Sequence, residues 1–329
     1  MAFKKLKVKV GQVTGTHTNF PTLIQPSLIT GLGSITLAEA QSARFYSDVG
    51  KTTEIAREIV SADEIHVKVT SMEALAEIWM DYDGIRSDYA VTATYGRNAV
   101  WSDYEFVNHY ETSTTNIPNS TGGANGTASG SITTGTAQKI GEGIDNTSGI
   151  IIASYTSPSN TSRQFSKTIW FKTTETDAGS IILSATSDGG PDNQIFFFER
   201  KLGFRCMGGT NVTVGSINQY RDGNWHKATL IKTGASTAEG RVNGAFVTSV
   251  NVGSYDRADA IWTGGRPQGN NFDGQFDEFK YRESSVSSSY DEAEYNNQNA
   301  NGSFWEATDA GGGGSTPAQA ARRGVIMMM

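Results

Sequence analysis

Short segments in which apolar and polar residues alternate recur along much of the chain. Residues 3–10 interleave lysines with apolar residues, and residues 55–60 and 65–69 alternate again. Side chains of a β-strand point to the two faces of a sheet in turn, so this period of two predicts strands. The predicted strands begin about 8–12 residues apart, with turn residues between them, and this spacing is typical of β-sandwiches.

The most regular predicted strands lie between residues 165 and 282. Residues 180–185 and 194–199 are apolar at consecutive positions, as strands in a sandwich interior are. Asn243-Gly244 predicts a two-residue hairpin turn, because both residues tolerate a positive φ. Residues 287–296 predict a short helix. The predicted fold class is all-β: two β-sandwich domains in tandem, followed by a Gly-rich C-terminal tail.

Length and composition divide the chain into three predicted parts. The 329 residues are enough for two domains, each with its own core. We expect the first β-sandwich over residues 1–110, the second over residues 111–300, and a linker with an apolar tail over residues 301–329. Residues 108–149 are rich in Thr, Ser, Gly and Asn, which would also suit a disordered linker. Their spaced isoleucines favour loops and first strands of the second sandwich.

Net charge and the length of apolar runs argue against a nucleic-acid partner and a membrane span. The chain has 27 Lys+Arg against 34 Asp+Glu, a net charge of −7, so we expect no nucleic-acid partner. The lysines near the start alternate with apolar residues and are expected on the solvated face of a strand. No apolar run approaches the roughly 20 residues of a membrane span, and no signal peptide is recognisable. Cys206 is the only cysteine and is expected to be an inert core thiol.

Four motifs carry a resemblance to a known family. They are Thr168–Lys172, Asp222–His226, Val242–Gly244 and Phe272–Lys280. In this order and at these separations they resemble the LamG-like, concanavalin A-like jelly-roll family over residues 117–297. The first module is similar to an uncharacterised bacterial β-rich domain that often precedes such sandwiches. This second resemblance implies an arrangement and no activity.

The resemblance to the concanavalin A-like family implies two kinds of binding site. Its members are often lectin-like and often bind calcium, which needs six to eight oxygen ligands. The candidate calcium ligands are Asp277, Asn119, Asn125, Asp188 and Asp192. The alternative is that the Asp277 carboxylate accepts backbone N–H groups.

Aromatic residues in Gly-rich loops are the candidates for glycan binding. The apolar face of a sugar stacks on such rings, and the candidate rings are Trp262, Phe272 and Tyr255. The alternative is that these rings fill the ends of the sandwich.

The residues give no support for an enzyme. Glycosidases of this fold carry two carboxylates in a Glu-x-Asp-x-x-Glu pattern, which is absent, and adjacent Asp277 and Glu278 should point to opposite sheet faces. No serine or cysteine lies in a nucleophile elbow. His17, His66 and His109 show no zinc-ligand spacing, and His226 is expected to be a packed or surface imidazole. We therefore expect no catalytic residues and no cofactor other than calcium.

The expected role is that of a bacteriophage virion protein. A tail fibre, tail tip or capsid-decorating protein is assembled in the host cytoplasm without an export signal, yet acts on a host-surface glycan. Such a protein is expected to be a homo-oligomer. The alternative is an exported bacterial adhesin, or a carbohydrate-binding accessory module of a polysaccharide-degrading enzyme.

The C-terminal peptide is the expected contact with other virion proteins. It follows four consecutive glycines, and its apolar side chains suit a groove on a partner. The alternative is an unstructured terminus. The expected docking residues are Arg322, Arg323, Val325, Ile326, Met327, Met328 and Met329.

Overall fold

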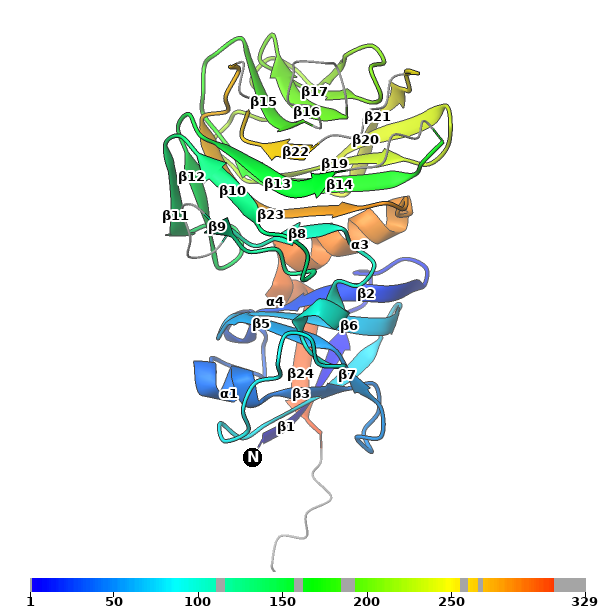
Figure 1. Cartoon of the computed structure of the whole chain (residues 1–329). Helices are drawn as coiled ribbons and strands as arrows, with labels where there is room; N and C mark the ends of the chain where they lie inside the picture. Colours follow the sequence, from blue (N-terminus) through cyan, green and yellow to red (C-terminus); the bar gives the residue numbers. More distant parts are fainter. Residues whose placement is uncertain are drawn as a thin grey trace, which may run out of the picture.

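The computed structural model describes residues 2–110, 116–156, 162–184, 193–254, 260–265 and 269–310. Two β-rich modules lie one above the other, and helix α3 (Ser288–Asn299) lies between them (Figure 1). Both the first described strand and the last belong to the lower module. The all-β fold predicted from the alternating pattern is confirmed.

The first module combines residues from both ends of the chain. Its elements are β1 (Ala2–Val8), β2 (His17–Ile24), the 3-10 helix η1 (Pro26–Leu28), α1 (Leu37–Ser42), β3 (Arg44–Tyr46), β4 (Glu54–Ile55), β5 (Arg57–Ser61), β6 (Glu64–Met72), β7 (Glu77–Tyr82), α2 (Arg97–Val100), α4 (Asn301–Phe304) and β24 (Trp305–Asp309). The second module carries the remaining strands.

Those strands of the second module are β8 (Phe106–Asn108), β9 (Asn116–Ile117), β10 (Gly126–Ser129), β11 (Ile132–Ala137), β12 (Glu142–Asn146), β13 (Ile150–Thr156), β14 (Phe165–Lys172), β15 (Gly179–Ser184), β16 (Gln194–Phe198), β17 (Lys201–Arg205), β18 (Val212–Val214), β19 (His226–Lys232), β20 (Thr237–Val242), β21 (Ala245–Asn251), β22 (Ala260–Thr263) and β23 (Gly274–Arg282).

The last described strand completes the first module. Its larger sheet has the order β24-β1-β7-β3-β4, and its smaller sheet the order β2-β6-β5. In the antiparallel β1–β24 pair, Val8 lies opposite Trp305 and Lys4 opposite Asp309. The structure therefore differs from the boundary predicted at residue 300, because residues 301–309 pack into the first module instead of forming a linker. The second module thus interrupts the first in sequence.

Two large antiparallel sheets form the second module. One has the order β18-β17-β16-β15-β22-β13-β10-β9, and the other β11-β12-β23-β14-β19-β20-β21, with β8 beside the second half of β23. Their facing side chains form one apolar core, to which Phe171 of β14, Phe197 of β16 and Phe276 of β23 contribute. Burial of such surface stabilises the fold by roughly 25 cal/mol per Å².

Two of the sequence motifs hold a loop and a hairpin together. Asn243 and Gly244 both have positive φ, as the predicted hairpin turn between β20 and β21 requires. The Asn243 Oδ1 accepts the Lys227 N–H at 2.9 Å, and its amide contacts His226 Nδ1 at 3.2 Å. His226 Nε2 in turn lies 3.0 Å from Asp222 Oδ1. His226, predicted to be a packed or surface imidazole, is buried.

A β-bulge in β23 changes the direction of two carboxylates. Thr168 pairs with Lys280 but Trp170 pairs with Asp277, so the register shifts between them, and Glu278 has a φ of +50°. Asp277 then accepts the Ile140 N–H, and Glu278 accepts a hydrogen bond from Gln298 of α3. The expectation that these adjacent carboxylates point to opposite faces is therefore wrong. Both turn toward the junction of the modules.

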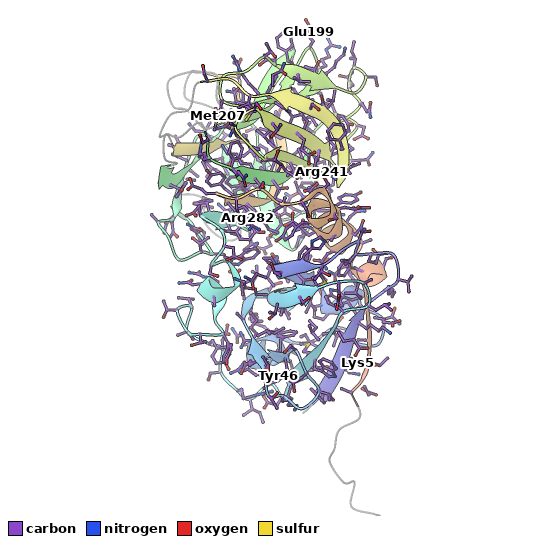
Figure 2. All side chains as sticks on the ribbon, turned by 90° about the vertical axis from the view of Figure 1, so that its right-hand side faces the viewer. Lys5, Tyr46, Glu199, Met207, Arg241 and Arg282 are labelled. Carbon is purple, nitrogen blue, oxygen red and sulfur yellow. The ribbon has the colours of Figure 1, made fainter. Side chains whose placement is uncertain are left out.

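Helix α3 joins the modules through polar side chains on several of its faces. Its N-cap Ser287 accepts the Tyr290 N–H, and the helix predicted at residues 287–296 is confirmed. Asp291 contacts Lys227 of the second module at 2.8 Å, while Asn297 donates to the Leu23 carbonyl of the first at 2.9 Å. Arg241 lies beside this helix in Figure 2.

Candidate functional site

A surface cavity of about 440 Å³ lies on the outer face of β15, β16 and β17. The strands alternate here, so that Ile195 and Phe197 enter the core while Phe196 and Phe198 do not. This hairpin lies at the end of the molecule remote from the first module, where Glu199 marks its tip (Figure 2). The cavity is lined by Gln194, Phe196, Phe198, Arg205, Asn211 and Asn270.

Two aromatic rings give the cavity its apolar surface. Phe198 is 48% exposed, which is unusual for so large an apolar side chain. The Phe196 ring packs on Gly203 of the neighbouring strand, where a Cβ would lie only 2.7 Å from ring atoms. Gly203 therefore provides the space in which Phe196 lies. The prediction that residues 194–199 are enclosed on both faces fails at Phe198.

Polar groups fixed by the protein stand beside these rings. Arg205 Nε donates to the Gly209 carbonyl at 2.8 Å, and Gln194 Nε2 donates to Ser184 Oγ at 3.3 Å. Glu199 and Arg200 form the hairpin turn, both with positive φ. A concave surface with aromatic rings and a few positioned polar groups is what a small polar ligand such as a sugar requires.

A second cavity of about 450 Å³ lies at one end of the sandwich, beside Thr173, Asp177 and Asp273. Its Glu175 forms an ion pair with Arg221 at 3.2 Å and accepts the Asp273 N–H at 2.9 Å. Burial raises the pKa of Glu175. This acid thus holds the loops together.

The residues predicted to bind glycan do not form a site on the described surface. Phe272 is fully buried, with its ring centroid 4.5 Å from that of Phe276, so its predicted stacking on a sugar is wrong. It fills the sandwich core because its loop folds inward. The backbone of Trp262 belongs to β22, opposite Ile152, but its side chain and all of Tyr255 lie outside the described residues.

The predicted calcium ligands are engaged by the protein itself where the structure describes them. Asn119 Oδ1 accepts the backbone N–H groups of Val107 and Thr121, and Asn125 Oδ1 accepts that of Asn119 at 3.0 Å. Asp277 accepts the Ile140 N–H at 2.7 Å. Burial and the neighbouring Glu278 charge raise the pKa of Asp277 well above its usual value, which disfavours the ionised form that calcium needs. Asp188 and Asp192 lie outside the described residues.

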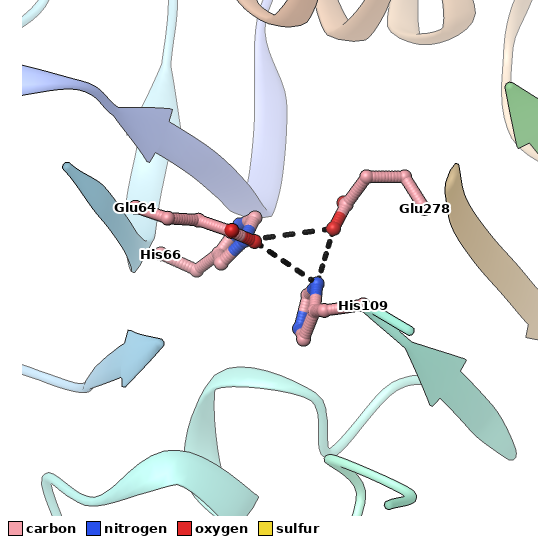
Figure 3. A group of neighbouring side chains, drawn as sticks. All are labelled: Glu64, His66, His109 and Glu278. Carbon is pink, nitrogen blue, oxygen red and sulfur yellow. Dashed lines mark hydrogen bonds and ion pairs between the residues drawn. The ribbon is translucent and has the colours of Figure 1, made fainter. Parts of the chain in front are cut away.

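Two histidines that are far apart in sequence meet in the structure. The His66 and His109 rings stack with centroids 4.5 Å apart, next to Glu64 and Glu278 (Figure 3). The lack of a zinc-ligand spacing in the sequence did not predict this cluster, because the fold brings together residues from three separate strands or strand ends. The Glu64-x-His66 spacing places two donors on one face of a strand and was the available signal.

The remaining single-residue expectations divide between buried and undescribed positions. Cys206 is fully buried, as expected of a core thiol. His17 is buried against Phe20 and Tyr290. The predicted docking residues from Arg322 to Met329 lie outside the described residues.

A family model described as the concanavalin A-like lectin/glucanases superfamily matches residues 145–289. This segment covers most of the second module and ends at the start of α3. The second module is a concanavalin A-like domain. The resemblance drawn from its four motifs is thereby confirmed. The match does not reach β24 or the first module.

Similar solved structures include domain 4 of AbnA, a GH43 extracellular arabinanase from Geobacillus stearothermophilus, in complex with arabinotriose. It has 18% identity, covers 58% of this chain and 98% of that chain, and gives a TM-score of 0.44. Trypanosoma rangeli sialidase has 11% identity, 64% and 34% coverage and a TM-score of 0.46. A botulinum neurotoxin type C structure has 13% identity, 61% and 52% coverage and a TM-score of 0.47.

The matched part is about a third of the sialidase and half of the neurotoxin chain. No curated protein sequence matches the chain. Among the described residues, no helix is both long and apolar enough to cross a membrane.

Proposed function

We propose that this protein is a non-enzymatic recognition protein of a bacteriophage particle that binds a host-surface glycan through its concanavalin A-like domain. The observation that carries the binding part is the cavity on β15–β17, with the exposed Phe198 ring beside Arg205, Gln194 and Asn211. A sugar would place its apolar face on Phe198 and its hydroxyls against the polar side chains.

The position of this cavity supports a recognition role. It lies at the end of the molecule remote from the first module, whereas Ala310 donates its N–H to the Phe3 carbonyl at the opposite end. The Gly-rich and apolar sequence after residue 310 therefore starts away from the proposed glycan site. Attachment to other virion proteins through Arg322–Met329 would leave the cavity accessible to the host.

The same proposal includes that the protein binds the glycan without hydrolysing it. Glu175, at the other cavity of the domain, is paired with Arg221, and Asp277 and Glu278 are buried at the module junction. A glycosidase needs two carboxylates flanking an accessible glycosidic bond. Glu175 shares its cavity with Asp177 and Asp273, but its charge is paired with Arg221, which supports a binding role. We therefore propose binding without hydrolysis.

The rival reading is an exported adhesin or an accessory module of a polysaccharide-degrading enzyme. The same cavity would serve that role equally well, so the distinction is the location of the protein. Mass spectrometry of purified virions tests it. Detection of this chain at stoichiometric abundance is expected, and its absence from particles whose genome encodes it would refute the virion role.

A glycan array and titration calorimetry on the hits test the binding site. Phe198→Ala should weaken binding by about fivefold or more, since a stacked aromatic contributes on the order of 1 kcal/mol or more. Phe246→Ala is the matched control, because Phe246 is 54% exposed on β21 of the other sheet. Wild-type binding unchanged by Phe198→Ala would exclude this cavity, and release of reducing sugar would refute the non-enzymatic proposal.

A further inference from the structure

Four buried side chains from distant parts of the sequence converge between the modules (Figure 3). Glu64 and His66 come from β6, His109 follows β8, and Glu278 lies in the β23 bulge. His66 Nε2 lies 3.1 Å from Glu64 Oε1 and 3.9 Å from Glu278 Oε1. His109 Nδ1 lies 3.5 Å from Glu64 Oε1 and in direct contact with Glu278 Oε1. One donor atom of each residue lies within 4.8 Å of the others.

We propose that Glu64, His66, His109 and Glu278 bind one divalent transition-metal ion, with zinc as the best fit, and that this ion links the two modules. Zinc bonds to imidazole nitrogen and carboxylate oxygen are about 2.0–2.2 Å, so tetrahedral donors stand roughly 3.4 Å apart. The separations involving Glu64 and His66 lie close to that value. Two nitrogens with two oxygens suit zinc or iron, whereas calcium prefers oxygen ligands alone.

A fifth residue orients one of the proposed ligands. His109 Nε2 lies 3.1 Å from Glu58 Oε2, on the side of the ring away from the cluster. Glu58 is itself fixed by hydrogen bonds from Trp101 Nε1 and Ser120 Oγ. A histidine that donates one ring N–H to a carboxylate presents the lone pair of the other nitrogen, which is the usual arrangement behind a metal-bound imidazole.

The β23 bulge aims Glu278 into the cluster. Its φ of +50° is unfavourable for a residue with a side chain, and bulges commonly redirect a side chain at functional sites. The outer oxygen, Oε2, is held by Gln298 Nε2 at 3.3 Å and Lys280 Nζ at 3.0 Å. These contacts leave Oε1 directed at His109.

The charge balance of the cluster favours a divalent ion. Three acids, Glu58, Glu64 and Glu278, face one lysine, Lys280. A divalent ion held between Glu64 and Glu278 would offset the repulsion between these two buried carboxylates.

A cavity of about 210 Å³ lies next to the cluster. Its lining includes Glu58 and His109, together with Asp88 and Tyr89. Of the four proposed ligands, His109 is the one that borders this cavity.

The direct test uses the full chain and zinc alone. Purified protein is stripped with a chelator, incubated with a small excess of Zn²⁺, desalted and analysed by inductively coupled plasma mass spectrometry. One zinc per chain is expected, together with a raised melting temperature that chelator reverses. X-ray absorption should show two imidazoles in the coordination shell. Folded protein that retains no zinc, or zinc without two imidazole ligands, would overturn the proposal.

Variants locate the ion within the chain. His66→Gln should abolish stoichiometric retention, and Glu58→Gln should weaken zinc binding roughly 10–100-fold by loosening His109. His17→Gln is the matched control, because His17 is also buried but lies outside the cluster. If His66→Gln fails to fold, the wild-type coordination spectrum still decides. Full retention by folded His66→Gln, or equal loss in His17→Gln, would place the ion elsewhere and refute this site.

Discussion

Replacement of Trp305 tests whether the end of the chain is an integral part of the first module. Its side chain is fully buried in the core that the two sheets of that module share. Removal of a buried tryptophan side chain to alanine costs about 3–5 kcal/mol in unfolding free energy. A domain of this size has a total stability of only about 5–15 kcal/mol. Trp305→Ala should therefore remove a large part of the stability of the first module.

The hydrogen bond of Trp305 contributes less to the unfolding free energy than its buried apolar surface does. Its Nε1 donates to the Leu23 carbonyl at 3.1 Å, but Asn297 and Asn301 donate to the same carbonyl at 2.9 and 2.8 Å. The carbonyl thus stays satisfied when the indole is lost, and the hydrogen-bond cost is about 1 kcal/mol or less. Trp305→Phe, which keeps most of the apolar contact, should cost only about 1–2 kcal/mol.

Hydrogen-exchange mass spectrometry over a urea series is the appropriate assay, because it reports each module separately. In Trp305→Ala, amides of β1 and β7 should lose protection at lower urea, while β14 and β19 should change little. Glu306→Ala is the matched control: Glu306 is exposed on the same strand, and its replacement should stay within about 0.5 kcal/mol. Unchanged exchange in β1 and β7 of Trp305→Ala would refute the assignment of β24 to the first module's core.

Three further predictions concern the second module and its junction with α3. Gly203→Ala should displace the Phe196 ring, since its Cβ would lie 2.7 Å from ring atoms, and should weaken glycan binding without unfolding either module, as calorimetry and circular dichroism would reveal. Asn243→Ala should cost about 1–3 kcal/mol in denaturant unfolding, because the buried Lys227 N–H loses its acceptor and alanine disfavours positive φ; a cost below 0.5 kcal/mol would contradict this. Burial opposes the charge of Asp291, and the neighbouring Glu294 carboxylate repels it. The attraction of Lys227 and Arg241 is larger than these two effects, so the pKa of Asp291 is lowered. The stabilisation is therefore present above the unfolded pKa near 4 and is lost as pH falls below it. Asp291→Asn should make the free energy of unfolding fall less steeply between about pH 5 and pH 2. An unchanged pH dependence would argue against the ion pair.

Much of the second module could be predicted because its signals are local. The predicted strand at residues 166–172 and the Asn243-Gly244 turn depend on neighbouring residues, and the structure confirms both. The four motifs also identified the concanavalin A-like domain, since each one has a local structural role. Asp222, His226 and Asn243, for example, hold one loop to one hairpin.

The pairing of the last strand with the first could not be predicted from local sequence in the same way. The strand Trp305–Asp309 pairs with Ala2–Val8 across about three hundred residues. Its sequence, Trp-Glu-Ala-Thr-Asp, is too short to show a clear alternation. The glycines that follow it indicate a linker instead. Only the unsatisfied edge of β1 gives it a partner, and an edge is a property of the folded sheet.

The proposed glycan site and the proposed metal site escaped prediction for different reasons. Phe196, Phe197 and Phe198 are all apolar, so the sequence shows no alternation there. The pattern therefore cannot tell which ring enters the core and which stays exposed. At Glu278 the alternation was clear but misleading, because the bulge reverses the direction that a regular strand would give. A bulge at a non-glycine residue has little local signature.

The bulge and the C-terminal helix together explain why the two modules meet through charged residues. Glu278 and Lys280 project from β23 toward α3, where Gln298 and Glu294 receive them. Buried charges are costly unless paired, so this interface is favourable only when both modules and α3 are in place. Excision of residues 145–289 alone would remove His109 and Gln298 from Glu278 and leave it paired with Lys280 only. Glu278 thus takes part both in the contact with α3 and in the proposed metal site.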